Sequence, residues 1–396
     1  MRLTQDNILG EFMRAGELQQ AGRWSEAAEL WRAIAAAAPQ SPEAHANLGA
    51  ALLELGAFAN SEAELTKAAG LAPEASWAHY HLARLFHLTH RPQPAEAEYR
   101  RALAVAPDDA KVRLGLGQLL LGLGRYPEGW PLYEARKDIP SQNAPRLDLP
   151  NEWRGETVAG KRLLIWPEQG FGDQIQFARF APVLQAMGAE VTLVAPPELA
   201  AVFASLGVTV VEQAERLRLE TPDHWTLPLS IPGRLGVTLE TVPATPYLSA
   251  PADRRAKWAG YAPQGAVGVV WRGRPTHGND AHRSLPSLAA FEPLADAGAT
   301  LLDLTEPRGD FADTAAILDQ LDLVVTVDTA IAHLAGAMGK LCWVLLPWFR
   351  TDWRWLEDRA DSPWYPSLRL FRQPGPGAWD PVLQEVASAY RTKFGS

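Results

Sequence analysis

Small and large apolar residues recur at a fixed interval through the first 137 residues. Pro39, Pro73 and Pro107 are spaced by 34 residues, and four further columns keep that register. Two columns hold small residues: Ala15, Gly49, Ala83 and Gly117 in one, and Ala27, Ser61, Ala95 and Gly129 in the other. A third column holds the large residues Trp31, Leu65, Tyr99 and Tyr133. The fourth marks a mid-unit turn at Gly22, Gly56 and Gly124, with His90 in the third unit. Small residues let two helices cross closely, and one helix pair cannot bury its apolar face alone. The pattern therefore predicts stacked helical pairs.

This repeat resembles the tetratricopeptide repeat. The resemblance implies an all-α solenoid over residues 1–137 with a concave surface that binds a protein segment. We expect Asn47, His45, His79 and Arg113 to face this groove as acceptor-binding residues. The alternative is a scaffold with nothing bound in the groove. Trp130 and Tyr133 are expected to cap the stack against the next domain.

From residue 161 the pattern changes to short apolar strands that alternate with amphipathic helices. Residues 138–160 form an irregular linker, which we expect Trp153 to dock. Strands are predicted at 161–166, 190–195, 208–211, 266–272, 300–304, 323–327 and 341–346, and helices at 173–187, 197–206, 288–296, 311–320, 330–338 and 380–394. Such alternation predicts parallel sheets. We divide it into two α/β halves, residues 161–255 and 256–396, with the last helix returning to the first half.

Composition narrows the functional classes. A net charge of −9 and a pI near 5.6 argue against a nucleic-acid partner, which needs a basic face. The single cysteine, Cys342, lies in an apolar run and is expected to be a core thiol. The start, MRLTQDNILGEFMRAG, lacks an apolar signal core, and no run reaches the length of a membrane span, so we expect a soluble, cytoplasmic protein. Clusters of His or Cys at ligand spacing are missing, so no metal site is expected.

Polar residues gather where strands are predicted to end. In LLIWPEQGFGD (163–173), Gly170 and Gly172 permit a tight turn, Asp173 opens a helix, and Gln176 lies one turn later. In VVTVDTAIAHLAGAMGK (324–340), Asp328 and Thr329 precede a small-residue helix that carries His333. The alternatives are that Asp173, Asp328 or Thr329 only caps a helix and that His333 is a core histidine.

Two further loops carry basic and aromatic residues. WRGRPTHGNDAHRS (271–284) contains residues suited to phosphate, unless it is only a solvated loop: Trp271, Arg272, His277, Asn279, Asp280, Arg283 and Ser284. In residues 346–366, Trp353 and Arg354 could contact a base or sugar, and structural packing is the equal alternative. Together these loops predict an enzyme that holds a phosphate-bearing donor in a cleft between the halves.

With these motifs in place, the chain resembles bacterial tetratricopeptide-repeat proteins fused to a GT-B glycosyltransferase domain, related to the ADP-heptose heptosyltransferases. The matching segments are EQGFGDQIQFARF (168–180), WRGRPTHGNDAHRS (271–284), DFADTAAILDQLDLVVTVDTAIAHLAGAMGK (310–340), DWRWL (352–356) and SPWYP (362–366). A similar layout occurs in flagellin glycosyltransferases, whose repeats hold the flagellin acceptor. The resemblance implies a tetratricopeptide solenoid followed by an α/β GT-B fold of two Rossmann-like halves.

The resemblance also implies roles for individual residues. Asp173 would be the general base, Arg283 and Ser284 would hold donor phosphates, and Asp328, Thr329 and His333 would hold donor phosphate or sugar. Ala330 replaces the glycine usual in the Asp-Ser/Thr-Gly-x-x-His segment, and arginine stands where lysine is common in the basic loop, so the resemblance leaves the sugar open.

The expected function is a metal-independent, inverting transfer from a nucleotide sugar to a Ser or Thr hydroxyl of a flagellin-like protein acceptor held by the repeats. The nucleotide sugar is a co-substrate, and no other cofactor is expected. Two alternatives remain open: transfer to lipopolysaccharide or another glycan, and a repeat-based binding module whose transferase fold is inactive.

Overall fold

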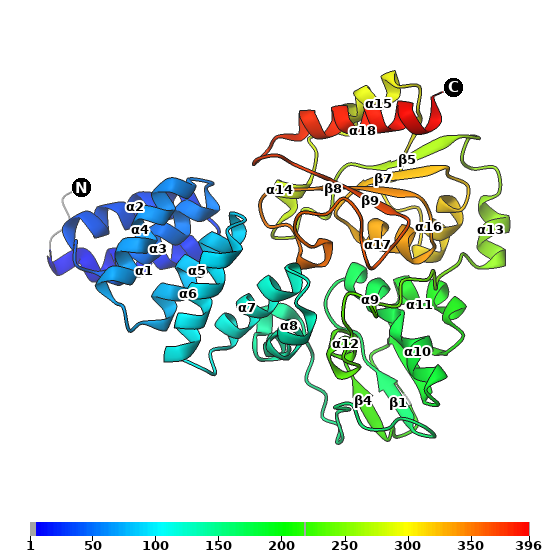
Figure 1. Cartoon of the computed structure of the whole chain (residues 1–396), viewed down its shortest axis with the longest axis horizontal. Helices are drawn as coiled ribbons and strands as arrows, with labels where there is room; N and C mark the ends of the chain where they lie inside the picture. The colour runs from blue at the N-terminus through cyan, green and yellow to red at the C-terminus, as the bar shows by residue number, and fades with distance from the viewer. Residues whose placement is uncertain (1–4, 218, 396) are drawn as a thin grey trace. The chain divides into compact units, whose positions relative to one another are not determined.

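The computed structural model describes residues 5–217 and 219–395. The first four residues of the N-terminal segment MRLTQDNILGEFMRAG, for which we expected no signal core, lie outside the described residues. The chain divides into two compact units, Met1–Leu120 and Leu121–Ser396 (Figure 1). This boundary comes before the predicted one at residue 137. The reason is that Tyr126, Trp130 and Tyr133, from the last predicted repeat, pack their rings against Trp353 in the second unit.

The first unit is built from antiparallel helices. These are α1 (Gln5–Gln20), α2 (Trp24–Ala37), α3 (Pro42–Glu54), α4 (Phe58–Leu71), α5 (Ser76–Leu88), α6 (Pro92–Val105) and the start of α7 (Ala110–Gly122). The small and large columns are buried as predicted: a Cβ on Gly49 would meet Leu65 Cγ at 2.6 Å, so glycine permits this helix crossing. Gly22, Gly56 and His90 all adopt a left-handed backbone with φ between 56° and 74°, which confirms the turn column.

The second unit contains two α/β halves. The first comprises α8 (Tyr126–Tyr133), β1 (Arg162–Ile165), α9 (Phe171–Ala178), α10 (Phe180–Ala186), β2 (Glu190–Ala195), α11 (Pro197–Phe203), β3 (Thr209–Glu212), β4 (His224–Thr226) and α12 (Ile231–Arg234). Short 3-10 helices η1 (Glu134–Asp138), η2 (Pro140–Gln142), η3 (Ala204–Leu206) and η4 (Pro228–Ser230) join them. Among the described residues its four strands form a parallel sheet in the order β3-β2-β1-β4.

The second half carries its own parallel sheet. Its elements are α13 (Ala252–Trp258), β5 (Ala266–Val270), α14 (Asp280–Arg283), η5 (Leu288–Phe291), α15 (Glu292–Asp296), β6 (Thr300–Asp303), α16 (Phe311–Leu318), β7 (Leu323–Val327), α17 (Ala330–Ala337), β8 (Cys342–Leu346), η6 (Trp353–Trp355), β9 (Leu368–Arg372) and α18 (Trp379–Phe394). Its described strands follow the order β6-β5-β7-β8-β9. The sequence pattern missed β4 and the edge strand β9.

The last helix does not return to the first half, which corrects the prediction. Leu383, Val386 and Tyr390 of α18 join a core with alternate residues of β5, β7 and β8, such as Val325 and Leu345. Figure 1 shows α18 beside α15 on one face of this sheet, with α16 and α17 on the other. The apolar stripe of α18 therefore covers its own half.

Of three other local predictions, one is corrected and two are confirmed. The helix predicted at 173–187 begins at Phe171 and divides into α9 and α10 at Arg179. Trp153 is 1% exposed, and its indole Nε1 donates to Glu156 O at 2.8 Å, so the linker is docked as expected. Cys342 is a buried free thiol in β8.

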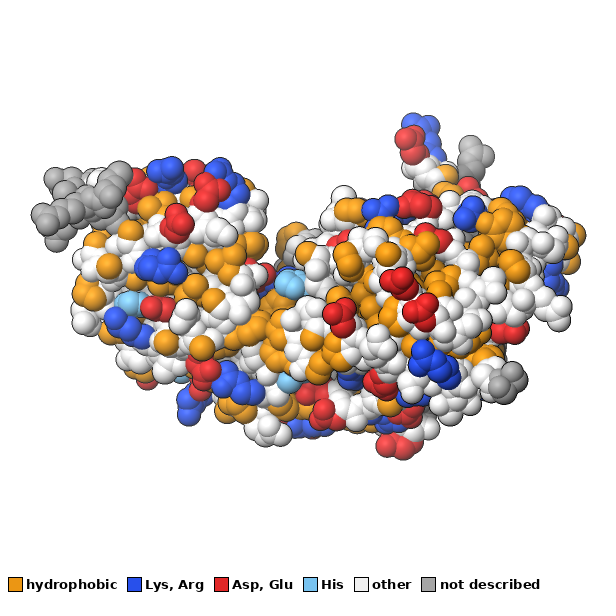
Figure 2. All heavy atoms as spheres, turned by 90° about the horizontal axis from the view of Figure 1, so that it is seen from above, with side chains coloured by type: hydrophobic (Ala, Val, Ile, Leu, Met, Phe, Trp, Pro, Cys, Tyr) orange, Lys and Arg blue, Asp and Glu red, His pale blue; other side chains and the backbone are white. Residues whose placement is uncertain are grey.

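No helix among the described residues is long and apolar enough to cross a membrane. On the face shown in Figure 2, basic and acidic side chains are interspersed over each unit.

Candidate functional site

The predicted polar loops lie at the carboxyl ends of strands where the sheet order reverses. The Gly170–Asp173 turn follows β1, which lies between β2 and β4, while the basic loop and Asp328 follow the neighbouring strands β5 and β7. In open parallel sheets such positions leave a crevice, because the connections on the two sides diverge. α17 packs on α9 and α16 packs on α11, so these ends of the two halves face each other (Figure 1).

The glycine turn holds Asp173 from one side. The Gly170 N–H donates to Asp173 Oδ2 at 2.9 Å, and Gly170 is the residue before the first turn of α9. The other oxygen, Oδ1, lies 2.5 Å from Arg354 Nη2. Asp173 is therefore not only a helix cap: it forms an ion pair with a residue from the second half.

Arg354 is itself fixed. Its Nη1 donates to both oxygens of Asp352 at 2.9 and 3.0 Å, and the guanidinium lies 4.5 Å from the Trp353 ring. Burial opposes its charge, but the carboxylates of Asp352 and Asp173 raise the pKa of Arg354 well above its ordinary value. Burial likewise opposes ionisation of Asp352, yet Arg354 holds the pKa of that carboxyl below its usual range.

Gly172 and His333 meet where the halves face each other. A Cβ on Gly172 would lie 2.8 Å from His333 Cδ2, so only glycine permits this approach. His333 Nδ1 is 3.1 Å from the Tyr365 hydroxyl, and its ring stacks on Trp355 at 5.1 Å. Burial lowers the pKa of His333 to about 3, helped by the charge of Arg354. The imidazole is thus neutral near pH 7.

The basic loop is held together by its own side chains. Ser284 Oγ accepts from the Gly273 N–H at 3.0 Å and donates to Asp280 Oδ1 at 2.9 Å. Arg283 Nη1 donates to the Asp328 carbonyl at 2.7 Å, which connects this loop to the end of β7. A Cβ on Gly273 would clash with Arg283 Nη2, so this glycine makes room for the guanidinium.

The rest of the loop is placed around this core. The Trp271 N–H donates to Thr305 Oγ1, and Arg272 pairs with Glu306. The Asn279 amide donates to Arg350 O at 3.0 Å. Partial desolvation of the ring, and then the charge of Arg283, lower the pKa of His277. The loop reaches the first half through Arg274, which lies 4.8 Å from the ring of Phe171.

Asp328 and Thr329 form the start of α17. Thr329 Oγ1 accepts from the Ile331 N–H at 3.3 Å, so it caps the helix, as the structural alternative expected. Burial, and then the Asp352 carboxylate, raise the pKa of Asp328 to about 6. Carboxyl groups with pKa values shifted this far toward neutrality are common at functional sites.

Two predicted donor-binding residues lie in packed surroundings. Gln176 is fully buried, and neither amide atom has a hydrogen-bond partner among the described residues. Trp353 is 6% exposed and packs in an aromatic cluster with Tyr126, Trp130, Tyr133 and Trp364. The structure therefore assigns the Trp353 ring to packing against α8, which corrects its prediction as a ligand contact.

Sequence reasoning missed the clamp formed by Arg179. This buried side chain donates to the carbonyls of Gln176, Pro243 and Trp364 at 2.8 to 3.0 Å. Its guanidinium also lies 4.6 Å from the Tyr365 ring. It connects the α9–α10 junction to the loop after β8, and only its position at a helix break could have drawn notice.

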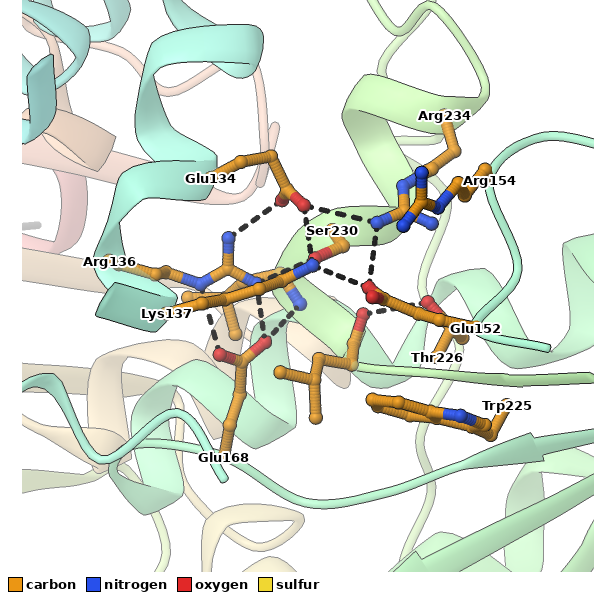
Figure 3. Close-up of polar contacts among 12 residues, drawn as sticks. Glu134, Arg136, Lys137, Glu152, Arg154, Glu168, Trp225, Thr226, Ser230 and Arg234 are labelled. Atoms are coloured by element: carbon orange, nitrogen blue, oxygen red, sulfur yellow. Dashed lines mark hydrogen bonds and ion pairs between the residues drawn. The ribbon is translucent and has the colours of Figure 1, made fainter. Parts of the chain in front are cut away.

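A second missed feature joins the end of α8 to the glycine turn. Figure 3 shows Arg136 between Glu134 and Glu168. Arg136 and Glu168 form two parallel hydrogen bonds of 2.9 and 3.0 Å, and both side chains are fully buried. Glu168 Oε1 also accepts from the Leu229 N–H at 2.9 Å. Because Glu168 directly precedes the Gln169–Gly170 turn, this network anchors the loop that carries Asp173.

In the first unit, two of the predicted groove residues face inward instead. His45 Nδ1 lies 2.5 Å from Glu64 Oε2 and its Nε2 lies 3.1 Å from Pro39 O. His79 repeats this arrangement with Glu98 and Pro73 at 2.6 and 2.8 Å. Both rings are buried, so they latch helices within one repeat, and the prediction that they face the groove is corrected. Asn47 on α3 and Arg113 on α7 are half-buried.

A different face of α5 carries aromatic and basic side chains that are partly accessible to solvent. Trp77, Tyr80, His81 and Arg84 follow i, i+3, i+4, i+7 spacing and are all half-buried. Arg84 Nη2 donates to Glu54 of α3 at 2.7 Å. Burial and the nearby Arg84 lower the pKa of His81 to about 4, so it is neutral near pH 7. Sequence reasoning missed this stripe, and the helical spacing of its aromatic and basic residues is the signal that could have found it.

No group of three or more potential metal-ligating side chains occurs among the described residues. Two hollows, of about 660 and 640 Å³, lie away from these loops, one beside β9 and α18 and the other along β1 and β2. Neither hollow coincides with the strand-end loops, so we define the candidate site by the loops themselves.

Comparison with known proteins supports the repeat assignment. Residues 12–76 and 89–143 match the family model of the tetratricopeptide repeat. The chain contains tetratricopeptide repeats. Over 439 aligned residues it is 27% identical to Protein FlbA of Caulobacter vibrioides, which covers 98% of this chain and 73% of FlbA. The similarity to FlbA thus extends through both units.

Solved structures give only partial matches to the chain. A crystal structure of MamA protein is 19% identical and covers 35% of this chain and 76% of MamA, with a TM-score of 0.30. The Arabidopsis OM64 TPR domain is 19% identical and covers 29% of this chain and 94% of that domain, with a TM-score of 0.28.

Proposed function

We propose that the protein is a GT-B glycosyltransferase that moves a sugar from a nucleotide-sugar donor to a Ser or Thr hydroxyl of a protein. The proposed reaction inverts the anomeric centre and is metal-independent. The repeats hold the acceptor protein, which is flagellin-like, and the donor lies between the two α/β halves.

The observation that carries this proposal is the convergence of three strand-end loops. Asp173 from the first half, Arg283 from the basic loop and the start of α17 at Thr329 lie at facing sheet ends, connected through Arg354 and His333. A carboxylate opposite a cationic loop and a helix N-terminus suits an acceptor hydroxyl on one side and a phosphate leaving group on the other.

The chemistry follows from this arrangement. Asp173 removes the proton of the acceptor hydroxyl while its oxygen attacks the anomeric carbon from the face opposite the phosphate. The bond between that carbon and the phosphate oxygen breaks, and its electron pair leaves with the nucleotide phosphate. Arg283 and the N–H groups at the start of α17 stabilise the added negative charge. Ser284 acts indirectly here, since its hydroxyl already bridges Gly273 and Asp280.

Binding of a protein acceptor rests on the repeats. Concave faces of stacked helical repeats are extended surfaces that bind other chains. In this chain the stripe Trp77, Tyr80, His81 and Arg84 offers aromatic area and a cation on one helix face, and Asn47 lies on α3. These residues replace His45 and His79 as the proposed acceptor contacts.

The test begins with a thermal-shift screen of UDP-, GDP-, ADP-, dTDP- and CMP-linked sugars, because a specific ligand raises the melting temperature. Sugar transfer by the full chain is then measured with the donor that binds, using Ser- and Thr-containing protein and a lipopolysaccharide fraction as separate acceptors. Asp173→Asn is expected to lower turnover by about 100- to 10,000-fold while still binding the nucleotide.

Asp148→Asn, on an exposed loop, is the matched control and should retain turnover. Wild-type turnover by Asp173→Asn would remove Asp173 from the mechanism. Transfer only to the glycan fraction would favour the alternative acceptor, and the absence of both nucleotide binding and transfer would leave a protein-binding module.

A further inference from the structure

The carboxylate of Asp173 is held by both halves of the second unit. Oδ2 accepts from the Gly170 N–H of the first half, and Oδ1 pairs with Arg354 of the second half at 2.5 Å. Each carboxylate oxygen has two lone pairs, so both oxygens can still accept a proton while being oriented in this way. The two contacts therefore set the direction of the carboxylate without consuming its capacity as a base.

Arg354 is built to hold a fixed position. Its side chain is 5% exposed, both Asp352 oxygens accept from Nη1, and the Asp352 side chain also accepts from the Arg354 backbone N–H at 2.9 Å. The rings of Trp353 and Phe177 lie 4.5 and 5.5 Å from the guanidinium. Phe177 is on α9, one turn beyond Asp173, so the guanidinium is fitted to that helix as well as to its own loop.

This arrangement leaves Arg354 poorly suited to a donor phosphate. Its Nη1 donates to both Asp352 oxygens, and Nη2 forms an ion pair with Asp173 Oδ1 without hydrogen-bond geometry. Nε also has no hydrogen-bond partner among the described residues. Arg283 differs, because its Nη1 is engaged by a neutral carbonyl, that of Asp328, while its Nε lies 3.5 Å from Asp280 Oδ1. A phosphate would have to displace a carboxylate from Arg354 but not from this part of Arg283.

We infer that Arg354 is the positioning residue of Asp173, acting on the base and not on the donor. This inference rests on the proposed function and reassigns Arg354 within it. The base is then complete only when the loop after β8 in the second half meets the glycine turn in the first. A misplaced base would slow proton transfer without weakening nucleotide binding.

The experiment compares Arg354→Gln and Arg354→Lys with the wild-type full chain. For each, kcat and donor KM are measured, and nucleotide affinity is measured by calorimetry, with rates normalised to the binding-competent fraction. Arg354→Gln is expected to lower kcat on the order of 100-fold, the scale of a misplaced reacting group, with donor KM and nucleotide affinity unchanged. Arg354→Lys should recover part of kcat, because it keeps the charge but lacks the planar fork.

Arg359→Gln is the matched control, since this arginine lies on the same loop and its guanidinium pairs with the exposed Asp361 at 2.6 Å. Its kcat and KM should stay at the wild-type values. If Arg354→Gln folds poorly, Asp352→Asn weakens the anchor of Arg354 while leaving both Arg354 and Asp173 in place. That variant should also lose kcat and keep nucleotide affinity.

Two results would overturn the inference. Loss of nucleotide affinity in Arg354→Gln, with affinity kept in Asp173→Asn, would assign Arg354 to the donor. Normal kcat in both Arg354→Gln and Asp352→Asn would show that Asp173 needs no such support. Failure of the proposed function looks different, because the wild-type chain itself would then show no transfer, and the inference would fall with it.

Discussion

At the scale of single residues, the buried His333 and the half-buried Asp328 have pKa values shifted in opposite directions. His333 has its pKa lowered to about 3, and Asp328 has its pKa raised to about 6. Burial is the main cause in both, because it disfavours the charged form of each group. Arg354, Asp352, Arg179 and Tyr365 face His333 from the packed elements around it.

The signs give a testable pH dependence. His333 is neutral in the folded chain, whereas an unfolded histidine titrates near 6.5. Its contribution to stability is therefore complete above pH 6.5 and is lost as the pH falls toward 3, by about 2 kcal/mol at pH 5. We expect His333→Gln to lose less stability than the wild type between pH 7 and pH 5, measured by urea unfolding with tryptophan fluorescence.

Asp328→Asn supplies the opposite sign. The raised pKa of Asp328 contributes stability below pH 4 that is lost as the pH rises through 6, so acidification stabilises this group. Asp328→Asn should therefore lose more unfolding free energy than the wild type when the pH falls from 7 to 5. The same pH dependence in all three proteins would contradict the burial of these groups.

At the scale of elements, α5 performs two tasks on two faces. His79 points inward and latches Glu98 of α6 to the Pro73 carbonyl, while His81, two residues later, lies on the half-buried outer stripe. Two residues correspond to about 200° on a helix, so neighbouring histidines serve opposite sides. His45 on α3 repeats the latch one unit earlier.

This division predicts different costs for two similar substitutions. His79→Ala removes two hydrogen bonds and leaves a buried carboxylate without this partner, so we expect a loss of about 1–3 kcal/mol in the stability of the first unit. His81→Ala should cost less, since its ring is not latched in this way. Thermal unfolding of the full chain followed by far-UV circular dichroism would compare them. A larger loss of stability in His81→Ala than in His79→Ala would refute the stabilising role of the His79 hydrogen bonds.

At the scale of the whole molecule, buried and half-buried ion pairs join segments far apart in the sequence. Arg136, just after α8, pairs with Glu168 before the glycine turn, and Arg234 pairs with Glu134 and Glu152 at 3.1 and 2.9 Å. Figure 3 shows these charges of both signs gathered around Ser230. The network holds the linker, α12 and the loop of Asp173 as one body within the second unit.

Breaking this network should be costly. Arg136→Met leaves Glu168 buried without its cation, and we expect a loss of about 3–5 kcal/mol in the unfolding free energy of the second unit. Arg125→Met is the control, because its ion pair with Glu128 is exposed and should contribute less than about 1 kcal/mol. Urea unfolding monitored by tryptophan fluorescence measures both, and equal losses would contradict the structural role of the buried pair.

The sequence by itself determined the local architecture. The 34-residue columns predicted the helical crossings and the mid-unit turns, because residue size and backbone freedom act at short range. Alternating apolar strands and helices predicted the parallel sheets and placed Asp173, Arg283 and Asp328 at strand ends. These features depend on periodicity, which is present in the chain before it folds.

Only the tertiary structure decided which residues meet. It turned His45 and His79 inward, placed α18 on its own sheet, and brought Arg354 to Asp173 and Arg136 to Glu168. The physical reason is that periodicity specifies which face of an element is apolar but not which distant element covers it. Ion pairs between segments far apart in the sequence form only after the sheets and helices have brought those faces together.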